Sequence, residues 1–554
     1  MKRLLILTLL ASAAFAGNKY SPDLNTQNWN LVDCIIQFKT PASNNDLRQL
    51  WNYGSIKKQF NVINAIRMPL PAALIPFLQN LPNIAYISPV RKMKPTLDIT
   101  TQSVNANLVW PLGWTGTGVG VAVIDSGIVS RADFLNSAGT ASRVVYRQSF
   151  VSGQSTTDDF GHGTHVAGII GSSGRSSTGV TFTRTFKGMA PNVNLIDLRV
   201  LDANGAGDDS DVIDAIQTAI ALKNTYNIRV INLSLGRPVF ESYAQDPLCQ
   251  AVEAAWKAGI VVVVAAGNSG RDGSGHRNGY GTVSSPGNDP YVITVGATNA
   301  RGTANIYDDQ VASYSSKGPT LLDHIVKPDI VAPGNSVVSV LASTNCTLFN
   351  QSGRTHVNVN TYQLTGYGAS SDYLRLSGTS MATPVVAGAV ALLLQKYPSL
   401  TPDQVKARLM KTASKAFAPM HTTAFDSITS LLFNGQSDMF TVGSGYLNIQ
   451  AALNNTDLVT KPALSPLVVY DPATRTVQLV RDLSVVWGDS VVWGDSVIWG
   501  DVVFTGNLVM GRTTLWGSSV VWGDSDQDGF SVVWGDSTGL AMQITATSAD
   551  DGDQ

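Results

Sequence analysis

The sequence predicts an α/β protein in which a mostly parallel sheet is covered by helices on both faces. Between about residues 108 and 453, short runs of β-branched residues alternate with helical patterns. These runs are apolar nearly throughout rather than at every second position, which is typical of parallel strands buried on both faces. The chain has 554 residues, enough for several domains and a large core.

Five apolar runs and two helical patterns define this central domain. The helical run Thr383–Lys396 is apolar nearly all round, so we expect it at the centre. The run Pro402–Ala413 is amphipathic, and Thr401 before it is a good N-cap residue. The predicted strands are Val119–Ile124, Asn194–Val200, Val230–Ser234, Ile260–Ala266 and Val292–Val295.

Residues 1–16 have the three zones of a secretory signal peptide. Lys2 and Arg3 are followed by the apolar stretch Leu4–Leu10 and by Ala14-Phe15-Ala16, an A-x-A cleavage site. A buried N-terminal helix is the alternative, but the order of the zones favours export. We therefore expect a secreted protein, extracellular or associated with the cell surface. No later apolar run has the ~20 residues of a membrane span, so no membrane anchor is expected.

Residues from about 17 to 94 form a second, smaller unit. A strand-helix-strand pattern occurs twice, which predicts a small α+β unit. The polar stretch Thr96–Asn107 lacks a clear periodicity and is predicted to be a linker. The expected strands are Cys34–Phe38, Ile56–Phe60, Val62–Met68 and Ile84–Ile87, and the expected helices are Asn45–Trp51 and Pro71–Leu81.

The composition changes again beyond Asn455, where a hexad repeat appears. Copies of Val-Val-Trp-Gly-Asp-Ser lie at Val485–Ser490 and Val491–Ser496 and recur at Val520–Ser525 and Val532–Ser537, and a shorter variant, Val-Ile-Trp-Gly-Asp, lies at Val497–Asp501. A six-residue period turns an α-helix through about 240° and so aligns no helix face, whereas an even period keeps each residue on one side of a strand. Short β segments with Gly-Asp turns are one prediction for this tail, and a flexible, partly disordered extension is the other.

Charge and cysteine content exclude several classes of protein. Charged residues make up 14% of the chain and the net charge is -2, which argues against a nucleic-acid binder that relies on phosphate contacts. The three cysteines are too few for a disulfide scaffold, and none belongs to a C-x-x-C pair. Zinc-ribbon and dithiol redox proteins are therefore excluded.

Polar residues stand where the apolar strands and helices of the central domain begin or end. Asp125 follows the strand Val119–Ile124, at the sheet edge where ligand sites of open α/β sheets lie. His162 and His165 lie among glycines at a predicted helix start. An isolated Asp in such a place is most often a turn or cap residue, and two histidines without further ligands make a weak metal site.

Asn268 and Ser380 occupy similar places. Asn268 follows the strand Ile260–Ala266, and alone it would be an ordinary turn former. Ser380 precedes Pro384, and proline is tolerated best in the first turn of a helix, so the helix is predicted to begin near Ser380. A hydroxyl there meets the positive end of the helix dipole, which favours negative charge that develops nearby.

Together the four residues supply what acyl transfer at neutral pH requires: a nucleophile, a base, a group that orients the base, and donors for the oxyanion. Ser380 would attack, and His162 would take its proton and later protonate the leaving amine. Asp125 would hold the imidazole in the required tautomer. The side-chain amide of Asn268 and the backbone N–H of Ser380 would bind the oxyanion.

Four segments in this order resemble the signatures of the subtilisin-like serine proteases. They are Asp125-Ser126-Gly127, His162 to Gly168, Ala265 to Asn268, and Gly378 to Pro384. The chain order Asp, His, Ser is also that of subtilisin. In the family the first histidine of the second segment is the base, so the resemblance makes His162 the catalyst and gives His165 a supporting, buried role.

The resemblance implies a subtilisin-like three-layer αβα domain, preceded by a small ferredoxin-like α+β propeptide and followed by a β-rich or disordered repeat tail. The expected boundaries are a signal peptide at 1–16, a propeptide at 17–98, the catalytic domain at 99–455 and a C-terminal extension at 456–554. In the family the propeptide is an inhibitor and folding chaperone that is cut away, so Cys34 would leave with it. Cys249 and Cys346 would remain, either as a disulfide or as free thiols.

The run Ile231–Gly236 resembles the family's strand that pairs with an extended substrate, although by itself it would be an ordinary buried strand. The resemblance makes Ser234-Leu235-Gly236 and Ala265-Ala266-Gly267 the walls of the primary substrate pocket. Neither segment brings a carboxylate that would select Lys or Arg, so we expect cleavage after apolar or aromatic residues. No cofactor is needed for the chemistry, and structural calcium is implied by resemblance alone.

The predicted function is that of a secreted serine endopeptidase, made as a self-processed zymogen. Its partners would be protein and peptide substrates and its own propeptide, and it would act as a monomer without nucleic acid. A catalytically inactive subtilase-fold module for binding or adhesion is the alternative, and an esterase is a third interpretation. The presence of all four site residues argues against the inactive module, and the peptide-pairing run at 234–236 favours the protease.

Overall fold

The computed structural model divides the chain into two compact units, Met1–Met93 and Lys94–Gln554. The predicted signal peptide and most of the hexads lie outside the described residues. The structure describes residues 19–20, 24, 26–60, 64–89, 97–272, 279–415, 421–426, 431–471, 476–480, 496–499, 502–505, 508–511 and 544–546.

The N-terminal unit has the β-α-β-β-α-β order of a ferredoxin-like fold. Its sheet has the strand order β2-β3-β1-β4, with β1 in antiparallel pairing with both β3 and β4. The predicted helix Pro71–Leu81 is only partly helical, because β3 continues to Pro71. The elements are β1 (Leu31–Phe38), α1 (Asn44–Trp51), β2 (Lys58–Phe60), β3 (Ala65–Pro71), α2 (Ile75–Leu78) and β4 (Ile84–Pro89).

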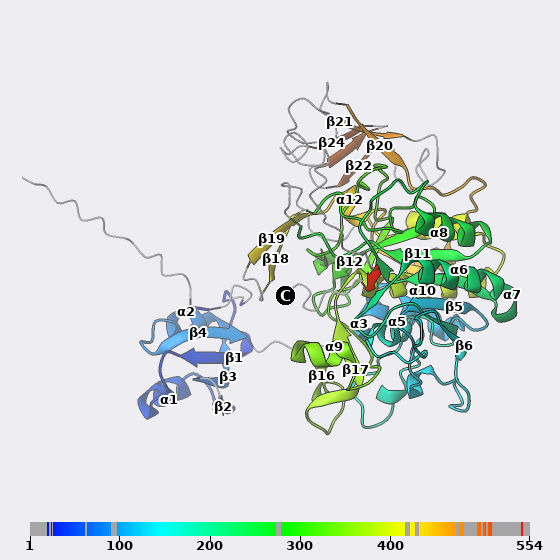
Figure 1. Ribbon diagram of the computed structural model, residues 1–554. Helices are drawn as coiled ribbons and strands as arrows, with labels where there is room; N and C mark the ends of the chain where they lie inside the picture. The colour runs from blue at the N-terminus through cyan, green and yellow to red at the C-terminus, as the bar shows by residue number, and fades with distance from the viewer. Residues whose placement is uncertain are drawn as a thin grey trace, which may run out of the picture. The chain divides into compact units, whose positions relative to one another are not determined.

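An eight-stranded sheet forms the centre of the second unit (Figure 1). The strands run in the order β13-β12-β11-β9-β5-β7-β6, and β14 also pairs with β12. All of these pairings are parallel except that of β13 with β12, so the mostly parallel sheet is confirmed. The strands are β5 (Gly120–Asp125), β6 (Val144–Ser149), β7 (Asn194–Arg199), β9 (Ile228–Leu233), β11 (Val261–Ala265), β12 (Ile293–Asn299), β13 (Gln310–Val311) and β14 (Ile330–Pro333).

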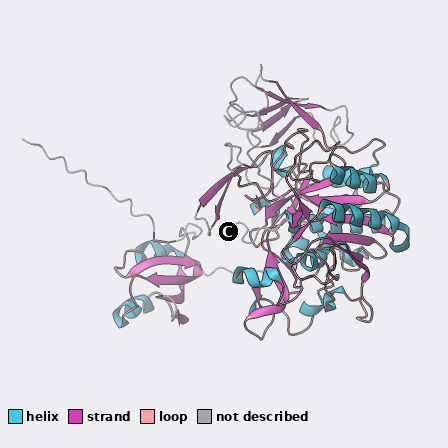
Figure 2. Cartoon of the chain, in the orientation of Figure 1, coloured by secondary structure: helices cyan, strands magenta, loops and turns pink. Residues whose placement is uncertain are grey.

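Helices cover the sheet in two groups, which confirms the three-layer αβα arrangement (Figure 2). Helices α5 and α10 pack on one another and on the sheet, and α6 and α8 do the same. Helix α10 begins at Thr379, next to Ser380 as predicted, and Thr401 caps α11 through a capping box with Gln404. These helices are α5 (His162–Gly171), α6 (Asp209–Ala221), α8 (Pro247–Lys257), α10 (Thr379–Lys396) and α11 (Pro402–Thr412).

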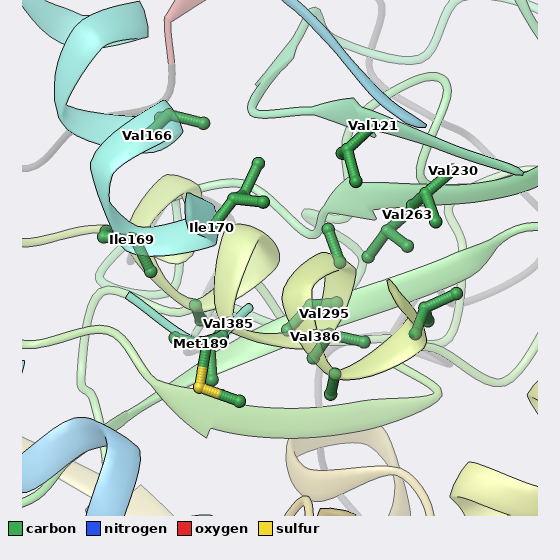
Figure 3. Close-up of a cluster of buried hydrophobic side chains, with 14 of the residues drawn as sticks. Val121, Val166, Ile169, Ile170, Met189, Val230, Val263, Val295, Val385 and Val386 are labelled. Atoms are coloured by element: carbon green, nitrogen blue, oxygen red, sulfur yellow. The ribbon is translucent and has the colours of Figure 1, made fainter. Parts of the chain in front are cut away.

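Apolar side chains lock α5 and α10 to the sheet (Figure 3). Val121, Val230, Val263 and Val295 come from four neighbouring strands, and Ile170 of α5 is one of their partners in this cluster. Helix α10 is buried on all sides from Thr379 to Leu394, as its uniformly apolar sequence predicts. The packing fixes the N-termini of both helices relative to the strand ends, and these are the places where the site residues lie.

The prediction of an irregular linker over Thr96–Asn107 is wrong for most of that stretch. Helices α3 (Leu97–Ser103) and α4 (Ala106–Val109) form there. Ile99 and Val104 are buried, so a few tertiary contacts order a segment that has no clear amphipathic period. The predicted boundary at 98/99 therefore falls inside α3.

A separate three-stranded sheet, in the order β15-β17-β16, precedes Ser380 in the sequence. Strand β17 (Ala369–Leu376) pairs with β15 (Val337–Val340) and β16 (His356–Asn358). Farther along, β18 (His421–Asp426) and β19 (Leu431–Gln436) form a hairpin. The remaining helices of this unit are α7 (Lys223–Tyr226), α9 (Thr347–Gln351), α12 (Met439–Val442) and α13 (Ile449–Asn454).

The described part of the tail is β-rich, and one of its strands, β22, lies in a hexad, while the other hexads lie outside the described residues. Five strands form an antiparallel sheet in the order β20-β21-β24-β23-β22. Trp499 pairs with Val502, and only Gly500-Asp501 lie between the two strands in the sequence. The strands are β20 (Leu467–Asp471), β21 (Thr476–Val480), β22 (Ser496–Trp499), β23 (Val502–Thr505) and β24 (Leu508–Gly511).

All three cysteines are buried free thiols. The disulfide between Cys249 and Cys346 that the sequence left open is therefore absent from the structure. Within the described residues, no helix has the length and apolar character needed to cross a bilayer.

Candidate active site

Asp125 is the last residue of β5 and is fully buried. Its Oδ1 accepts hydrogen bonds from the backbone N–H of Ser126 at 2.8 Å and lies 2.8 Å from Nδ1 of His162. Because a carboxylate beside Nδ1 favours the tautomer with its proton on that nitrogen, Nε2 is left as an acceptor. The structure thus places the carboxylate where it can orient the imidazole.

His162 is the first residue of α5, and the approach of this helix to β5 depends on Gly163. A Cβ at Gly163 would lie 2.3 Å from the carbonyl oxygen of Gly127 and 3.2 Å from Cβ of Asp125. Side chains other than hydrogen do not fit there, so the glycine in His-Gly-Thr-His has a steric function. It allows the imidazole to reach Asp125.

We expect Gly163→Ala to lower kcat/KM for a peptide substrate by about 10- to 100-fold, since misplacement of a catalytic group by ~1 Å costs up to about 10²-fold. The cause is the backbone oxygen of Gly127, which would force α5 away from β5. Gly353→Ala is the matched control, because a Cβ there meets nothing within 4 Å. Unchanged kcat/KM in a folded Gly163→Ala protein would contradict the steric function.

Asp158 holds the start of α5, a function that the sequence analysis missed. The Asp158 carboxylate accepts hydrogen bonds from the backbone N–H of Gly161 at 2.7 Å and of Thr164 at 2.8 Å. The Ser126 hydroxyl also donates to it, at 2.8 Å, and accepts from the N–H of Gly163. Asp158 therefore links the residue after Asp125 to the first turn that carries His162. Its signal was an acidic residue just before a predicted helix start.

His165 is fully buried, as the resemblance implies. Its Nε2 lies 3.2 Å from the carbonyl oxygens of Val337 and Leu374, which come from β15 and β17. Burial away from water, together with a smaller effect of the neighbouring His162, lowers the pKa of His165 to about 3. His165 is therefore neutral at pH 7 and links α5 to β15 and β17.

Because the pKa of His165 is depressed in the folded chain, we expect the free energy of unfolding to fall as the pH is lowered below about 6.5. Below about pH 6.5 the unfolded chain binds a proton on this imidazole, whereas the folded chain does so only near its pKa of about 3. Between pH 7 and pH 4.5 this difference should cost about 2 to 3 kcal/mol of unfolding free energy. Denaturant unfolding at pH 7 and pH 4.5 measures this loss in two proteins, Ser380→Ala and Ser380→Ala with His165→Gln. An equal loss of unfolding free energy in both would contradict its assignment to His165.

Ser380 lies in the first turn of α10 and exchanges hydrogen bonds with Ser234. Oγ of Ser380 donates to the carbonyl oxygen of Ser234 at 3.0 Å, and Oγ of Ser234 donates to the carbonyl oxygen of Ser380 at 3.0 Å. The nucleophile candidate is thus fixed beside the predicted substrate-pairing run. In this structure its hydroxyl proton points to a carbonyl and not to the base.

Nε2 of His162 is buried and has no hydrogen-bond partner among the described residues. A buried nitrogen that lacks a partner costs free energy, and a catalytic function is one explanation for why such a group is kept. In apo enzymes the hydrogen bond between nucleophile and base is often absent and forms only when substrate binds. The orphaned nitrogen is therefore in the state that a general base for Ser380 would have before the reaction.

Asn268 follows β11 and contacts the residue before Ser380. Its Oδ1 accepts from the backbone N–H of Thr379 at 2.9 Å and from the Thr379 hydroxyl at 3.1 Å. These bonds fix the side-chain amide. Because both donors of Thr379 face the same atom, that atom must be the amide oxygen. Nδ2 is buried and has no partner within the described part of the chain, which leaves both of its protons available.

The two predicted pocket walls lie on either side of a residue that the sequence analysis did not single out. Oγ of Ser284 would be 2.6 Å from a Cβ at Gly236 and 3.2 Å from a Cβ at Gly267, so it lies beside both segments. Ser284 also donates to the carbonyl oxygen of Ala266 at 3.3 Å. Leu235, Ala265 and Ala266 are buried. The walls are therefore close together, with Ser284 between them.

The described residues contain no group of three or more His, Cys, Asp or Glu side chains that could hold a metal ion. The side chains present in that part of the molecule therefore do not fit a metal site of this kind, and no step of the chemistry is assigned to one.

The comparisons with known proteins agree with the arrangement of these residues. A family model described as the subtilase family matches residues 116–443, which include all four candidate residues. The chain belongs to the subtilase family. It is therefore a serine protease, a hydrolase of a family that needs no cofactor for catalysis.

Several curated relatives in this family cover most of the chain. Serine protease AprX of Bacillus subtilis is 37% identical over 404 residues, which span 70% of this chain and 84% of that protein. Subtilisin E of Bacillus subtilis is 35% identical over 404 residues, or 72% of this chain and 83% of its own length. Subtilisin DY of Bacillus licheniformis is 36% identical over 351 residues, which span 63% of this chain and 96% of that protein.

Proposed function

We propose that this subtilase is a secreted endopeptidase that cleaves peptide bonds through an Asp125-His162-Ser380 triad and an acyl-enzyme. The observation that carries the proposal is the 2.8 Å contact of Asp125 with Nδ1 of His162, together with the partnerless, buried Nε2 of the same ring. A serine nucleophile requires an imidazole whose Nδ1 is held by a carboxylate and whose Nε2 can accept the hydroxyl proton.

In the proposed reaction, rotation about the Cα–Cβ bond of Ser380 exchanges the carbonyl of Ser234 for Nε2 of His162 as acceptor. Nε2 then takes the hydroxyl proton while Oγ adds to the substrate carbonyl carbon. The protonated imidazole, stabilised by Asp125, gives this proton to the leaving amine as the C–N bond breaks. Water, activated by the same nitrogen, hydrolyses the acyl-enzyme and releases the carboxylate product.

Two donors would stabilise the oxyanion in this scheme. One is the side-chain Nδ2 of Asn268, which is held by the bonds of Oδ1 to Thr379 and is otherwise unpartnered in the described chain. The other is the backbone N–H of Ser380 at the N-terminus of α10, where the helix dipole adds to the effect.

The short strand β10 (Leu235–Gly236) supports peptides rather than small esters as substrates. Backbone pairing with such a strand accepts many sequences, and side-chain pockets then set the preference. We propose that Ser234-Leu235-Gly236 and Ala265-Ala266-Gly267 wall the primary pocket, with Ser284 limiting its depth. The pocket lacks a carboxylate from these segments, so apolar and aromatic residues are the proposed preference.

We expect Ser284→Gly to raise kcat/KM by about tenfold for substrates with a large aromatic residue at the cleaved bond, relative to substrates with alanine there. This is the size of effect that room for one methylene group has in an apolar pocket. The reason is that removal of the hydroxymethyl group frees the room between Gly236 and Gly267. A matched series of peptides that differ at this one residue measures the ratio. An unchanged ratio would place Ser284 outside the pocket.

The same proposal includes the life cycle of the chain. The signal peptide at 1–16 would direct export, and the ferredoxin-like unit would serve as a propeptide that the enzyme removes itself between residues 95 and 101. The mature monomer would act outside the cell or at its surface. Structural calcium, which the resemblance suggests, has no cluster of acidic side chains to bind to among the described residues.

Hydrolysis of an unfolded protein by the secreted chain tests the proposal. We expect internal cleavage of the protein, seen as fragments by mass spectrometry, and its complete loss after treatment with a serine-directed fluorophosphonate. Hydrolysis confined to small esters would favour the esterase. A folded chain that cleaves neither kind of substrate would favour the inactive binding module.

A further inference from the structure

The chain's own C-terminal segment lies against the proposed substrate strand. Strand β25 (Ile544–Ala546) pairs antiparallel with β10 (Leu235–Gly236) on one side and with β8 (Ala206–Gly207) on the other. Figure 1 shows β25 as the short red strand among the green and cyan elements of the central domain. It is the middle strand of this three-stranded sheet.

Strands β8 and β10 are suited to receive an extended peptide between them. Each is only two residues long, and each presents backbone N–H and C=O groups along the edge that faces the other strand. A peptide inserted between two such edges forms backbone hydrogen bonds on both of its sides, which gives affinity without demanding a particular sequence. Strand β25 occupies this position in the structure.

The direction of β25 is that of a substrate. Thr545 pairs with Gly236 and Ala546 with Leu235, so the strand runs toward Ser234 as residue numbers increase. The carbonyl oxygen of Ser234 is the atom that accepts the hydrogen bond of the Ser380 hydroxyl, at 3.0 Å. A substrate must run the same way, because the carbonyl end of its N-terminal half has to meet the nucleophile.

We propose that Ile544–Ala546 is an internal competitor, which occupies the groove between β8 and β10 in the manner of a substrate and weakens the binding of external peptides. This rests on the proposed function, because it assigns the same groove to substrates. The sequence from Gln543 to Ser548 is uncharged and rich in β-branched residues, without proline or glycine, so it favours a strand. A tethered segment has an effective concentration in the mM range, so even an affinity of about 1 mM fills the groove in about half of the molecules.

The first experiment compares KM for a short chromogenic peptide in secreted protein whose intact mass includes Gln554. One variant ends at Leu540 and lacks β25, and its matched control ends at Ser548 and keeps it. A second variant, Thr545→Pro with Ala546→Pro, removes one backbone donor from each side of the strand, and Thr545→Val with Ala546→Ser is its control.

We expect the two variants that lose β25 pairing to have a KM lower by about twofold or more, with kcat unchanged, since an occupied groove must first be vacated. Both controls should keep the KM of the full chain. Equal KM in all five proteins, with normal kcat, would overturn the internal competitor.

A binding measurement separates this inference from the proposed function. A fluorescent synthetic peptide of residues 541–549 is titrated into secreted protein that ends at Leu540, whose intact mass shows removal of the propeptide and which has been treated with a serine-directed fluorophosphonate, and its anisotropy is followed. Saturable binding that is weaker in the full-length protein treated in the same way supports the inference, whether or not the enzyme hydrolyses peptides. Absence of saturable binding up to several mM would overturn it, while hydrolysis by the Ser380-containing enzyme would leave the proposed function intact.

Discussion

Ser380→Ala should abolish peptide hydrolysis and leave a folded precursor that is not processed. Loss of the nucleophile of a serine protease of this kind lowers kcat by about 10⁶-fold. The fold should persist, because the substitution removes one hydroxyl whose hydrogen bond to the carbonyl of Ser234 is worth about 1 kcal/mol. Peptide hydrolysis and the mass of the secreted product measure the two effects.

Ser377→Ala is the matched control for this variant. Ser377 lies three residues earlier in the same segment, and its hydroxyl accepts a hydrogen bond from the backbone N–H of Ser336 at 2.9 Å. The control should therefore lose a similar amount of stability but keep its activity and its processing. If Ser380→Ala protein were processed normally in a host without other proteases, self-cleavage of the propeptide would be ruled out.

Asn268→Ala should lower kcat by about 10²- to 10³-fold with little change in KM, a range that comes from removal of an oxyanion donor in subtilisin itself. The physical reason is the loss of Nδ2, a donor that is buried and without a partner within the described residues. Alanine also deletes the acceptor of Thr379, so a fall in thermal stability should accompany the loss of turnover.

Asn268→Asp separates the donor from the structural function of this side chain. The carboxylate keeps an acceptor for the N–H and hydroxyl of Thr379, but it replaces Nδ2 by a charged oxygen that repels an oxyanion. We expect Asn268→Asp to be at least as inactive as Asn268→Ala. Near-normal kcat in Asn268→Asp would mean that Asn268 acts only by anchoring Thr379.

The strands, and the places of the four candidate residues at strand and helix ends, could be predicted because local chemistry decides them. A run such as Val261–Ala265 is apolar on both faces, as a buried parallel strand requires, and Asn268 follows it at the sheet edge where ligand sites of open α/β sheets lie. Pro384 likewise limits where α10 begins, so Ser380 could be placed in the first turn before the fold was known.

Other parts of the site depend on tertiary contacts that leave little trace in the sequence. Ser284 meets Gly236 and Gly267 only because three distant segments converge, and no local pattern distinguishes it from other loop serines. Helix α3 has no clear period and is ordered by the burial of Ile99. The pairing of β25 joins residues more than 300 positions apart, whereas the hexads before it indicated only short β segments.

Mapping the site of fluorophosphonate attachment tests the catalytic assignment most directly. The reagent reacts only with a serine that a neighbouring base has activated, so the labelled residue identifies the nucleophile. Intact mass and peptide mapping of the labelled secreted protein should show one adduct, on Ser380, and none after His162→Ala. A label on any other serine, or an equal extent of labelling in His162→Ala, would contradict the proposed triad.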